Sequence, residues 1–339
     1  MKGIAYPAHT MKRPSLPLGE LALIDSIRRD SEARGAGRVR VGIGDDCAIL
    51  RPPPGHEILV TTDFCLEGRH FRRDWHTPES AGHRCLARGL SDLAAMGARP
   101  LAAFLSLALP PGTDRRWIDR FFRGLRALAD EAGVPLAGGD TAEAPGGNIL
   151  ADIVLVGSAP SGKAIRRSTA RAGNLLYVTG HLGGAAAELS TLESHPGKAT
   201  KPGPAGRHPQ LFPAPRLAAG AALLRRALAT ACIDISDGLS TDLNHLCEAS
   251  GLSAEVELDL LPLHPLAARR LELALHGGED YELLFAASPS TRVPKQIAGV
   301  AITPIGRLLR RTRGPRMLAI DAGGRRTELV PGGWEHLRN

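Results

Sequence analysis

The sequence predicts a mixed α/β fold, of the α/β or α+β class, divided into two domains. Its 339 residues are enough for two domains of ordinary size, each with its own apolar core. Segments with strand character alternate with segments whose apolar residues recur at helical spacing, and they do so in both halves. A basic connector over residues 158–173 separates the halves. We therefore expect a flexible N-terminal extension over 1–17, a first domain over 18–160 and a second over 161–339.

The first half is predicted to be a succession of helices and strands. A helical pattern begins at Leu18, and short strands are expected at 38–41 and 57–60. Pro78 stands where a helix begins, ahead of a helical rhythm that continues to residue 90. The elements that follow are a buried strand at 101–109, a helix at 114–132, a short strand before 138–140 and a closing strand at 149–156.

The second half opens with a strand at 175–179, followed by a glycine-containing turn and an alanine-rich helix. Residues 194–215 are rich in proline, glycine and lysine, so we expect a loop there. The remaining expected elements are helices at 214–229 and 240–249, strands at 255–258 and after 277–281, and a terminal strand pair within 307–339.

The composition excludes several classes of protein. The longest apolar stretch, residues 100–111, is too short to span a bilayer, and no signal peptide is apparent. The five cysteines form no Cys-x-x-Cys pair, which argues against zinc and favours a reducing cytoplasm. The net charge of +7 comes with scattered arginines and no interleaved aromatic residues, so nucleic acid is not an expected partner. No lysine lies in a Walker-type loop, so phosphates must be held by metals, backbone amides and arginine.

Five aspartate-bearing segments carry the functional signal. They are Gly42-Ile-Gly-Asp-Asp46, Thr61-Thr-Asp63, Leu90-Ser-Asp92, Gly138-Gly-Asp140 and Ile233-Asp-Ile-Ser-Asp-Gly238. Most follow an apolar run, so we expect the carboxylates at strand ends, where turns project them into one cleft. Asp234 and Ser236, two apart on a strand-like segment, should share one face. Gathered carboxylates repel one another unless hard cations such as Mg²⁺ lie between them, whereas a single aspartate would simply cap a helix or form a turn. The recurrence predicts a nucleotide site with several Mg²⁺ ions.

These segments, together with Glu67-Gly-Arg-His-Phe71 and Gly277-Gly-Glu-Asp-Tyr-Glu-Leu283, resemble the motifs of the thiamine-monophosphate kinase family. The resemblance covers residues 18–334 in register and keeps all seven motifs in order. That family belongs to the superfamily of aminoimidazole ribonucleotide synthetase, selenophosphate synthetase and the hydrogenase-maturation dehydratase. The resemblance implies a two-domain aminoimidazole ribonucleotide synthetase-like fold, whose N-terminal domain binds ATP and Mg²⁺ and pairs in a homodimer.

The resemblance also implies roles for individual residues. The implied Mg²⁺ ligands are Asp46, Thr61, Thr62, Asp63, Asp92, Asp140, Asp234 and Asp237, of which Asp63, Asp92 and Asp237 would be catalytic. The implied ATP contacts are Phe122, Gly139, Asp140, Arg167 and Ser236, with Phe122 placed only by counting back from Gly139. The implied thiamine phosphate site is lined by His70, Glu279 and Trp334.

Simpler structural interpretations remain open for four of these residues. His70 would otherwise be a surface histidine, Trp334 a packing aromatic, Arg167 an exposed linker charge and Glu279 the cap of a turn. The chain departs from the family pattern at Gly89, where asparagine is usual, and over residues 142–145, where a Gly-Pro pair is usual. Residues 1–17 have no family counterpart, so Met11 is a second candidate initiator.

The implied reaction transfers the ATP γ-phosphoryl group to thiamine monophosphate, giving thiamine diphosphate and ADP in thiamine diphosphate biosynthesis. A phosphate monoester has a second pKa of roughly 6, so the acceptor is already mostly a dianion and no catalytic base is required. Catalysis would consist of positioning and charge neutralisation, with direct in-line transfer as the simplest path. The alternatives are another ATP-dependent enzyme of the superfamily and a catalytically silent nucleotide-binding protein. The sequence has neither the Cys-Gly loop of selenophosphate synthetase nor the terminal cysteine of the hydrogenase-maturation enzyme.

Overall fold

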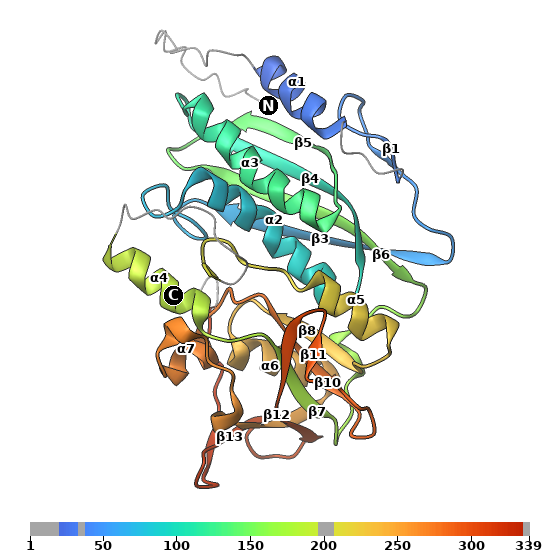
Figure 1. The fold of residues 1–339 in the computed structure, drawn as a ribbon, viewed down its shortest axis with the longest axis vertical. Helices are drawn as coiled ribbons and strands as arrows, with labels where there is room; N and C mark the ends of the chain where they lie inside the picture. The colour runs from blue at the N-terminus through green and yellow to red at the C-terminus, as the bar shows by residue number, and fades with distance from the viewer. Residues whose placement is uncertain (1–19, 33–37, 196–206, 335–339) are drawn as a thin grey trace, which may run out of the picture.

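The computed structural model describes residues 20–32, 38–195 and 207–334 (Figure 1). Two large sheets, one above the other in Figure 1, divide the chain, and helices pack against each of them. The described residues also include a separate two-stranded sheet. The expected extension over 1–17, with Met11, lies outside the described residues, as does part of the expected loop at 194–215.

The first sheet has four strands in the order β3-β6-β4-β5. Strand β6 pairs antiparallel with β3 and β4, and β4 pairs parallel with β5. Helices α2 and α3 cover one face of the sheet (Figure 1). The elements of this half are α1 (Glu20–Glu32), β1 (Val39–Val41), β2 (Ile49–Leu50), β3 (His56–Leu66), α2 (Pro78–Ala95), β4 (Arg99–Leu109), α3 (Arg115–Ala132), β5 (Leu136–Glu143) and β6 (Leu150–Pro160).

Helices α2 and α3 begin at residues that supply their own caps and cross at a distance that only glycine permits. The Thr77 side chain accepts from the Ser80 N–H at the start of α2, and Asp114 caps α3 in the same way. A Cβ atom on Gly82 would lie 2.0 Å from the Phe121 carbonyl oxygen. The backbones therefore approach closely enough to bury the apolar face of both helices on the sheet.

The second sheet has eight strands, in the order β14-β13-β9-β12-β7-β10-β8 with β11 added beside β12. All its pairings are antiparallel except that of β9 with β13. The strands are β7 (Leu175–Thr179), β8 (Ala231–Ile235), β9 (Leu252–Glu257), β10 (Glu282–Ala287), β11 (Gln296–Ile297), β12 (Val300–Arg310), β13 (Met317–Ile320) and β14 (Arg326–Glu328). The helices are η1 (Arg167–Thr169), α4 (Gly184–Ser194), α5 (Leu217–Arg225), α6 (Leu239–Ser250), η2 (Leu258–Leu260), η3 (Pro265–Ala267) and α7 (Leu271–His276).

The C-terminal end of α2 joins the two halves. Ala94 and Ala95 of α2 share an apolar cluster with Leu223 of α5 and Phe285 of β10. A Cβ on Gly220 of α5 would lie 1.9 Å from the Ala94 carbonyl oxygen, so the contact between these helices is also close. Because α2 packs on both sheets, its polar residues lie where the halves meet.

The predicted mixed α/β class is confirmed, but most of the aspartates do not lie at strand ends. Asp63, Asp140 and Asp234 lie within β3, β5 and β8, and Asp92 lies within α2. The prediction was wrong because the strand ladders continue through these positions, with Asp63 opposite Ile153 for example. Of the five segments, the first and last place an aspartate in a bend, at Asp46 and Asp237.

Several elements differ in extent from the sequence prediction. The expected strand at 57–60 is the eleven-residue β3, because polar residues at its end still pair with β6. The terminal strand pair is confirmed as β13 and β14, whereas α7 and the first half of β12 were not predicted.

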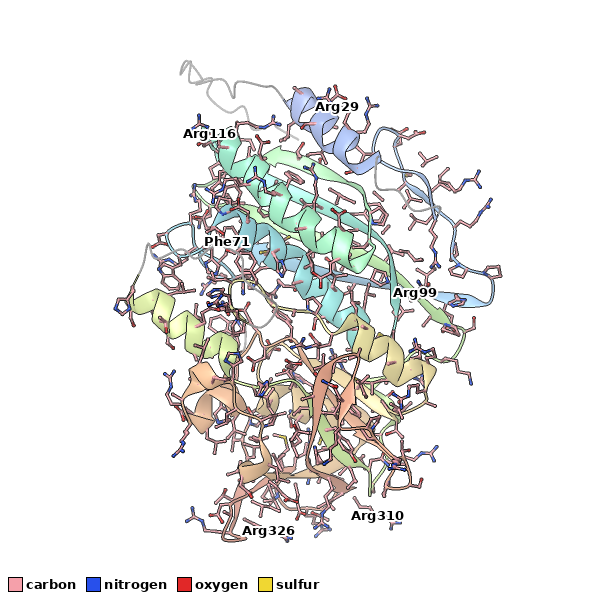
Figure 2. The ribbon with its side chains drawn as sticks, viewed as in Figure 1. Arg29, Phe71, Arg99, Arg116, Arg310 and Arg326 are labelled. Atoms are coloured by element: carbon pink, nitrogen blue, oxygen red, sulfur yellow. The ribbon has the colours of Figure 1, made fainter. Side chains whose placement is uncertain are left out.

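The charged surface agrees with the scattered arginines of the sequence. Arg29, Arg116, Arg310 and Arg326 are exposed and lie at the periphery of the molecule (Figure 2). Within the described part of the chain, no helix has both the length and the apolar character needed to cross a membrane. All five cysteines are free, and four of them are buried.

Candidate active site

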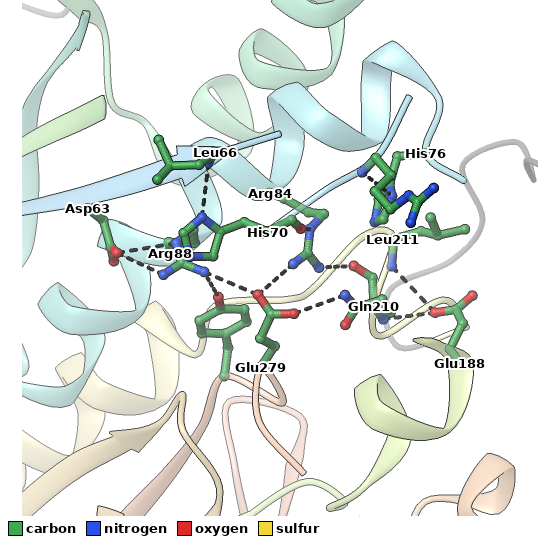
Figure 3. Close-up of polar contacts among 12 residues, drawn as sticks. Asp63, Leu66, His70, His76, Arg84, Arg88, Glu188, Gln210, Leu211 and Glu279 are labelled. Atoms are coloured by element: carbon green, nitrogen blue, oxygen red, sulfur yellow. Dashed lines mark hydrogen bonds and ion pairs between the residues drawn. The ribbon is translucent and has the colours of Figure 1, made fainter. Parts of the chain in front are cut away.

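A cleft of about 420 Å³ opens where α2, the end of β3 and the loops after β8 and before β10 meet. Most of the residues singled out in the sequence line it, namely Thr62, Asp63, His70, Asp92, Asp234, Ser236, Asp237, Glu279 and Trp334. Arg69, Arg88 and Tyr281 add further polar groups. Residues from distant parts of the sequence therefore converge on one site (Figure 3).

The buried Asp234 and the half-buried Asp92 of the cleft are each oriented by a hydroxyl donor. Thr61 Oγ1 donates to Asp92 Oδ2, and Ser91 Oγ donates to Asp234 Oδ2 at 2.7 Å. Burial and the charge of Asp234 raise the pKa of Asp92 to about 6, and burial likewise raises the pKa of Asp234. Donors of this kind orient carboxylates that bind a ligand through their remaining lone pairs.

Arg88 of α2 connects the acidic side of the cleft to the loop before β10. Its Nε and Nη2 atoms donate to Asp63 Oδ1 at 3.2 and 3.0 Å. Its Nη1 atom donates to Glu279 Oε1 at 3.1 Å and to the Tyr281 hydroxyl at 3.0 Å. Burial raises the pKa of Asp63 although Arg88 opposes that effect, because a carboxylate is stabilised by a neighbouring cation.

Glu279 is the centre of a second network. Its Oε1 atom accepts from Arg84 Nη2 at 2.6 Å as well as from Arg88, and its Oε2 atom accepts from Gln210 Nε2 at 2.9 Å (Figure 3). Burial alone would raise the pKa of Glu279, but the two arginines lower it to about 2. The backbone of Glu279 is left-handed, with φ of 67°, and its N–H donates to the Ser236 carbonyl oxygen at 2.7 Å. The carboxylate is therefore ionised and fixed.

The turn after β8 is held by Asp242, in the first turn of α6. Asp242 Oδ2 accepts from the N–H groups of Ser236, Asp237 and Gly238 at 3.0, 3.0 and 3.1 Å. The Trp334 N–H donates to the Asp237 carbonyl oxygen at 3.0 Å, so the C-terminal segment is attached to the same turn. Trp334 is 52% exposed and lines the cleft, so it is not buried in a packed core.

His70 lies after the end of β3 and lines the same cleft. The Leu66 N–H donates to His70 Nδ1 at 2.9 Å, so Nδ1 is unprotonated and the ring proton of the neutral form is on Nε2. Arg84 Nε donates to the His70 carbonyl oxygen at 3.2 Å. His70 is thus a half-buried residue with a fixed ring, not the surface histidine of the simpler interpretation.

Phe122, Gly139 and Asp140 lie together in a separate pocket of about 100 Å³ near α1. Apolar residues, among them Ile24 and Ile43, form much of its lining. Gly139 has φ of 148°, and a Cβ there would lie 1.9 Å from the Leu105 carbonyl oxygen. The pocket therefore combines an apolar base with one carboxylate at its edge.

A polar row on the other face of the first sheet lies between this pocket and the cleft. Thr62 Oγ1 donates to Asp152 Oδ1 at 2.8 Å, and Ser106 pairs with both Asp152 and Asp140 across the strands. Residues opposite one another on paired strands share a face, so the row crosses all four strands. Thr61 and Thr62 consequently point to opposite faces of β3.

Three of the expected site residues line neither the cleft nor the smaller pocket, namely Asp46, Arg167 and Thr61, the last of which contacts Asp92. Asp46 is exposed in the bend between β1 and β2. Arg167 is exposed in η1, and its charge opposes the effect of burial on the pKa of Asp92 and Asp234, so it lies close enough to act on both. Among the described residues, no three acidic, histidine or cysteine side chains converge as a preformed metal cage.

Comparisons with known proteins agree with the motifs and with the two-part architecture. Two family models match, for the N-terminal domain of AIR synthase related proteins over residues 44–159 and for their C-terminal domain over 171–298. Thiamine-monophosphate kinase of Salmonella typhimurium is 40% identical over 284 residues, covering 80% of this chain and 84% of that protein. The chain belongs to the thiamine-monophosphate kinase family.

Further relatives show the same similarity over more of the chain. The Bacillus subtilis thiamine-monophosphate kinase is 34% identical over 295 residues, covering 84% of this chain and 90% of that protein. A crystal structure of the Stenotrophomonas maltophilia kinase superimposes with a TM-score of 0.75 at 34% identity, covering 92% and 98% of the two chains. AaThiL complexed with AMPPCP and TMP gives a TM-score of 0.73 at 28% identity, covering 97% and 100%. The hydrogenase maturation protein HypE of E. coli, at 18% identity and a TM-score of 0.73, shares the fold.

The unusual Gly89 of this family member has a reason in its own core. A Cβ at this position would lie 2.8 Å from Leu155 Cδ1 and 3.6 Å from Thr61 Cγ2, so a larger residue would require Leu155 to move. Gly89 therefore packs closely on β6, and the nearby Asp92 and Thr61 are in contact.

Sequence reasoning missed the residues that hold the site in place. They are Arg84, Arg88, Ser91, Asp152, Gln210, Asp242 and Tyr281. For Asp242, an acidic residue in the first turn of a helix that follows a glycine was an available signal. For Arg84, its buried position on the apolar face of a predicted helix gave no indication of its partners, which lie 126 and 195 residues away.

Proposed function

We propose that this protein is a Mg²⁺-dependent kinase that transfers the γ-phosphoryl group of ATP to thiamine monophosphate, giving thiamine diphosphate and ADP. The observation that carries the proposal is the single cleft that Asp63, Asp92, Asp234 and Asp237 share with His70, Glu279 and Trp334. The thiamine-monophosphate kinase names of the relatives and the AMPPCP and TMP of the AaThiL complex support the same reaction.

The donor set suits Mg²⁺. Asp63, Asp92, Asp234 and Asp237 offer hard oxygen ligands, and burial with mutual repulsion makes the metal-free cluster unfavourable. Mg²⁺ keeps several water ligands and shares phosphate oxygens, so carboxylates spread around a cleft suit it better than a closed cage. When bound, it would supply charge neutralisation between the two polyanionic substrates.

Four further residues are proposed to support the metal carboxylates. Thr61 orients Asp92, and Thr62 and Asp140 belong to the polar row that leads from the cleft toward the smaller pocket. Asp46 would join the set from the β1–β2 bend. We retain these as proposed ligands alongside the four aspartates of the cleft.

The pocket at Phe122, Gly139 and Asp140 is the proposed base-binding end of the ATP site. Its apolar lining suits an adenine ring, and Gly139 lets β5 pack closely on β4 beside the pocket. Ser236, in the turn after β8, and Arg167, close to Asp92 and Asp234, would contact the phosphates. The nucleotide would then extend from the small pocket into the cleft.

The thiamine end of the acceptor would lie against Trp334, His70 and Glu279. A thiazolium ring is a permanent cation, which favours the indole face and the ionised Glu279. The acceptor phosphate is mostly a dianion at neutral pH, so the residues of the cleft need only position it for in-line attack. Asp63, Asp92 and Asp237 are the proposed catalytic carboxylates because they line the cleft where this phosphate would meet the nucleotide.

A homodimer formed through the first sheet is part of the proposal. The face of this sheet opposite α2 and α3 exposes Ile58, Val60, Phe64 and Leu150, with 46, 64, 61 and 37% of their surface accessible. These apolar side chains share the face with the polar row through Thr62 and Asp152, and exposed apolar side chains gathered on one face typically mark a protein interface. The cytoplasmic location stays a prediction from the cysteine content.

An end-point assay tests the reaction. Protein, Mg-ATP and thiamine monophosphate would be incubated, and the thiamine esters separated by chromatography after fluorescent oxidation. We expect thiamine diphosphate only when ATP and Mg²⁺ are both present. Asp63→Asn and Asp92→Asn should abolish it, whereas Asp259→Asn, at an exposed aspartate of η2, should not.

The same assay separates the alternatives. Nucleotide binding without turnover would favour a silent nucleotide-binding protein. Consumption of ATP without a new thiamine ester would favour another acceptor within the superfamily. Near-normal rates in both aspartate variants would defeat the assignment of the site.

A further inference from the structure

Arg88 lines the cleft, but neither the motifs nor the proposed reaction gives it a role. Its side chain is 14% exposed and lies on α2, one turn before Asp92. Arg69 is the other arginine of the cleft lining, and it is exposed and lies outside the helix. Of the two arginines in the cleft lining, Arg88 is therefore the one that a helix holds in place.

The guanidinium of Arg88 is fixed between the two ends of the cleft. The hydrogen bonds to Asp63 hold Nε and Nη2, and those to Glu279 and Tyr281 hold Nη1 (Figure 3). A guanidinium carries five N–H groups, so these four contacts leave one N–H on Nη2 without an acceptor among the residues that the structure describes. This donor belongs to a side chain whose rotation is already restricted, so a ligand would lose little further entropy by accepting from it.

We propose that Arg88 is a specificity-determining residue that binds the phosphate of the thiamine monophosphate acceptor, an inference that rests on the proposed function. Asp63, on one side of the guanidinium, is the proposed metal carboxylate, and Glu279, on the other side, belongs to the proposed thiamine end. The phosphate of thiamine monophosphate would lie between the thiamine moiety at Glu279 and the metal at Asp63, and Arg88 contacts both of these residues. The N–H that remains on Nη2 can donate one hydrogen bond to a phosphate oxygen, and a charge-assisted contact of this kind is strong.

Replacing Arg88 should affect the phosphate and spare the thiamine moiety. Glu279 keeps Arg84 at 2.6 Å and Gln210 at 2.9 Å without Arg88, so its carboxylate stays in place. His70 Nδ1 accepts from the Leu66 N–H and the Trp334 N–H donates to the Asp237 carbonyl oxygen, and these two bonds do not depend on Arg88. The binding energy that distinguishes thiamine monophosphate from thiamine should therefore fall while thiamine itself binds as before.

Titration calorimetry with thiamine monophosphate and with thiamine tests this, in Mg²⁺ and without ATP. The proteins are wild type, Arg88→Met, Arg88→Lys and, as a matched control from the same cleft, Arg69→Met. We expect Arg88→Met to weaken thiamine monophosphate about 10- to 100-fold, the range for hydrogen bonds to a charged group. The affinity for thiamine should change less than about twofold. Arg88→Lys should give an intermediate affinity for thiamine monophosphate, because it keeps the charge and loses the guanidinium contacts that fix the donor, and Arg69→Met should have little effect.

Three results would overturn the inference. These are an equal loss for both ligands in the Arg88 variants, an unchanged affinity for thiamine monophosphate, and a phosphate-selective loss only in Arg69→Met. If Arg88→Met does not fold, Arg88→Lys supports the same comparison. Turnover is not needed, so a wild type that binds thiamine monophosphate yet forms no diphosphate contradicts the proposed function alone.

Discussion

Replacing Arg84 by methionine should destabilise the protein more than any exposed arginine replacement, because Arg84 ties three segments together in the core. Its side chain has no exposed surface. It donates to the carbonyl oxygens of His70 and Gln210 and to the carboxylate of Glu279. Methionine retains much of the length and apolar contact but supplies none of the donors.

The structure gives the size of the effect in two ways. The pKa of Glu279 is lowered from its ordinary 4.5 to about 2, which at about 1.4 kcal/mol per pH unit corresponds to about 3 kcal/mol of stabilisation of the ionised form. Removal of one partner of a buried ion pair costs about 3–5 kcal/mol. Glu279 keeps Arg88, so we expect the lower end, about 3 kcal/mol, or about 6–12 °C in Tm for a unit of ordinary domain size.

Urea unfolding of Arg84→Met, Arg84→Lys and Arg116→Met at several pH values would measure this. Arg116 is exposed on α3, so its replacement should change stability by less than about 0.5 kcal/mol. Because the folded pKa of Glu279 is lowered, its contribution is present above about pH 4.5 and is lost as the pH falls toward 2. The deficit of Arg84→Met should shrink over that window. A deficit below about 1 kcal/mol at pH 7, or one that does not change with pH, would refute the reasoning.

Three other predictions follow from the site and its surroundings. In EDTA, the Asp92→Asn variant should have a Tm a few degrees above that of wild type, because the substitution removes the repulsion between Asp92 and Asp234. The variant should also lose the rise in Tm that Mg²⁺ gives wild type. A Tm below that of wild type in EDTA would contradict this prediction. Gly139→Ala should weaken ATP binding at least about tenfold by forcing β5 away from Leu105, whereas Gly146→Ala, with open space around it, should not, as measured with a fluorescent ATP analogue. Val60→Glu should shift the protein from dimer to monomer in light scattering, whereas Val330→Glu, at a position of similar exposure, should leave the mass unchanged.

The sequence predicted which residues meet in space better than it predicted the path of the chain around them. Asp63, Asp92, Asp234 and Asp237 meet in one cleft because their motifs are short, local and polar among apolar neighbours. The secondary structure predicted around them was partly wrong, because the strand continues past Asp63 and Asp92 lies within a helix. A pattern of residue types does not show whether a ladder ends at a polar residue, because that depends on the partner strand.

The supporting network could not be predicted, because its contacts join residues far apart in the sequence. Arg84 reaches Glu279 across 195 positions, and Gln210 reaches the same carboxylate from the segment before α5. Nothing near Arg84 or Gln210 in the sequence reveals this partner. The separation of Phe122, Gly139 and Asp140 from the cleft likewise depends on strand order, which places β5 and β3 at opposite edges of the sheet.

The central claim, direct transfer of a phosphoryl group in this cleft, is tested most directly by following the label from γ-labelled ATP. Rapid quenching with Mg²⁺ and thiamine monophosphate should show label entering thiamine diphosphate, with no labelled protein at any time and no transfer in Asp63→Asn. Label that passes first through the protein, or that appears only as inorganic phosphate, would contradict the account.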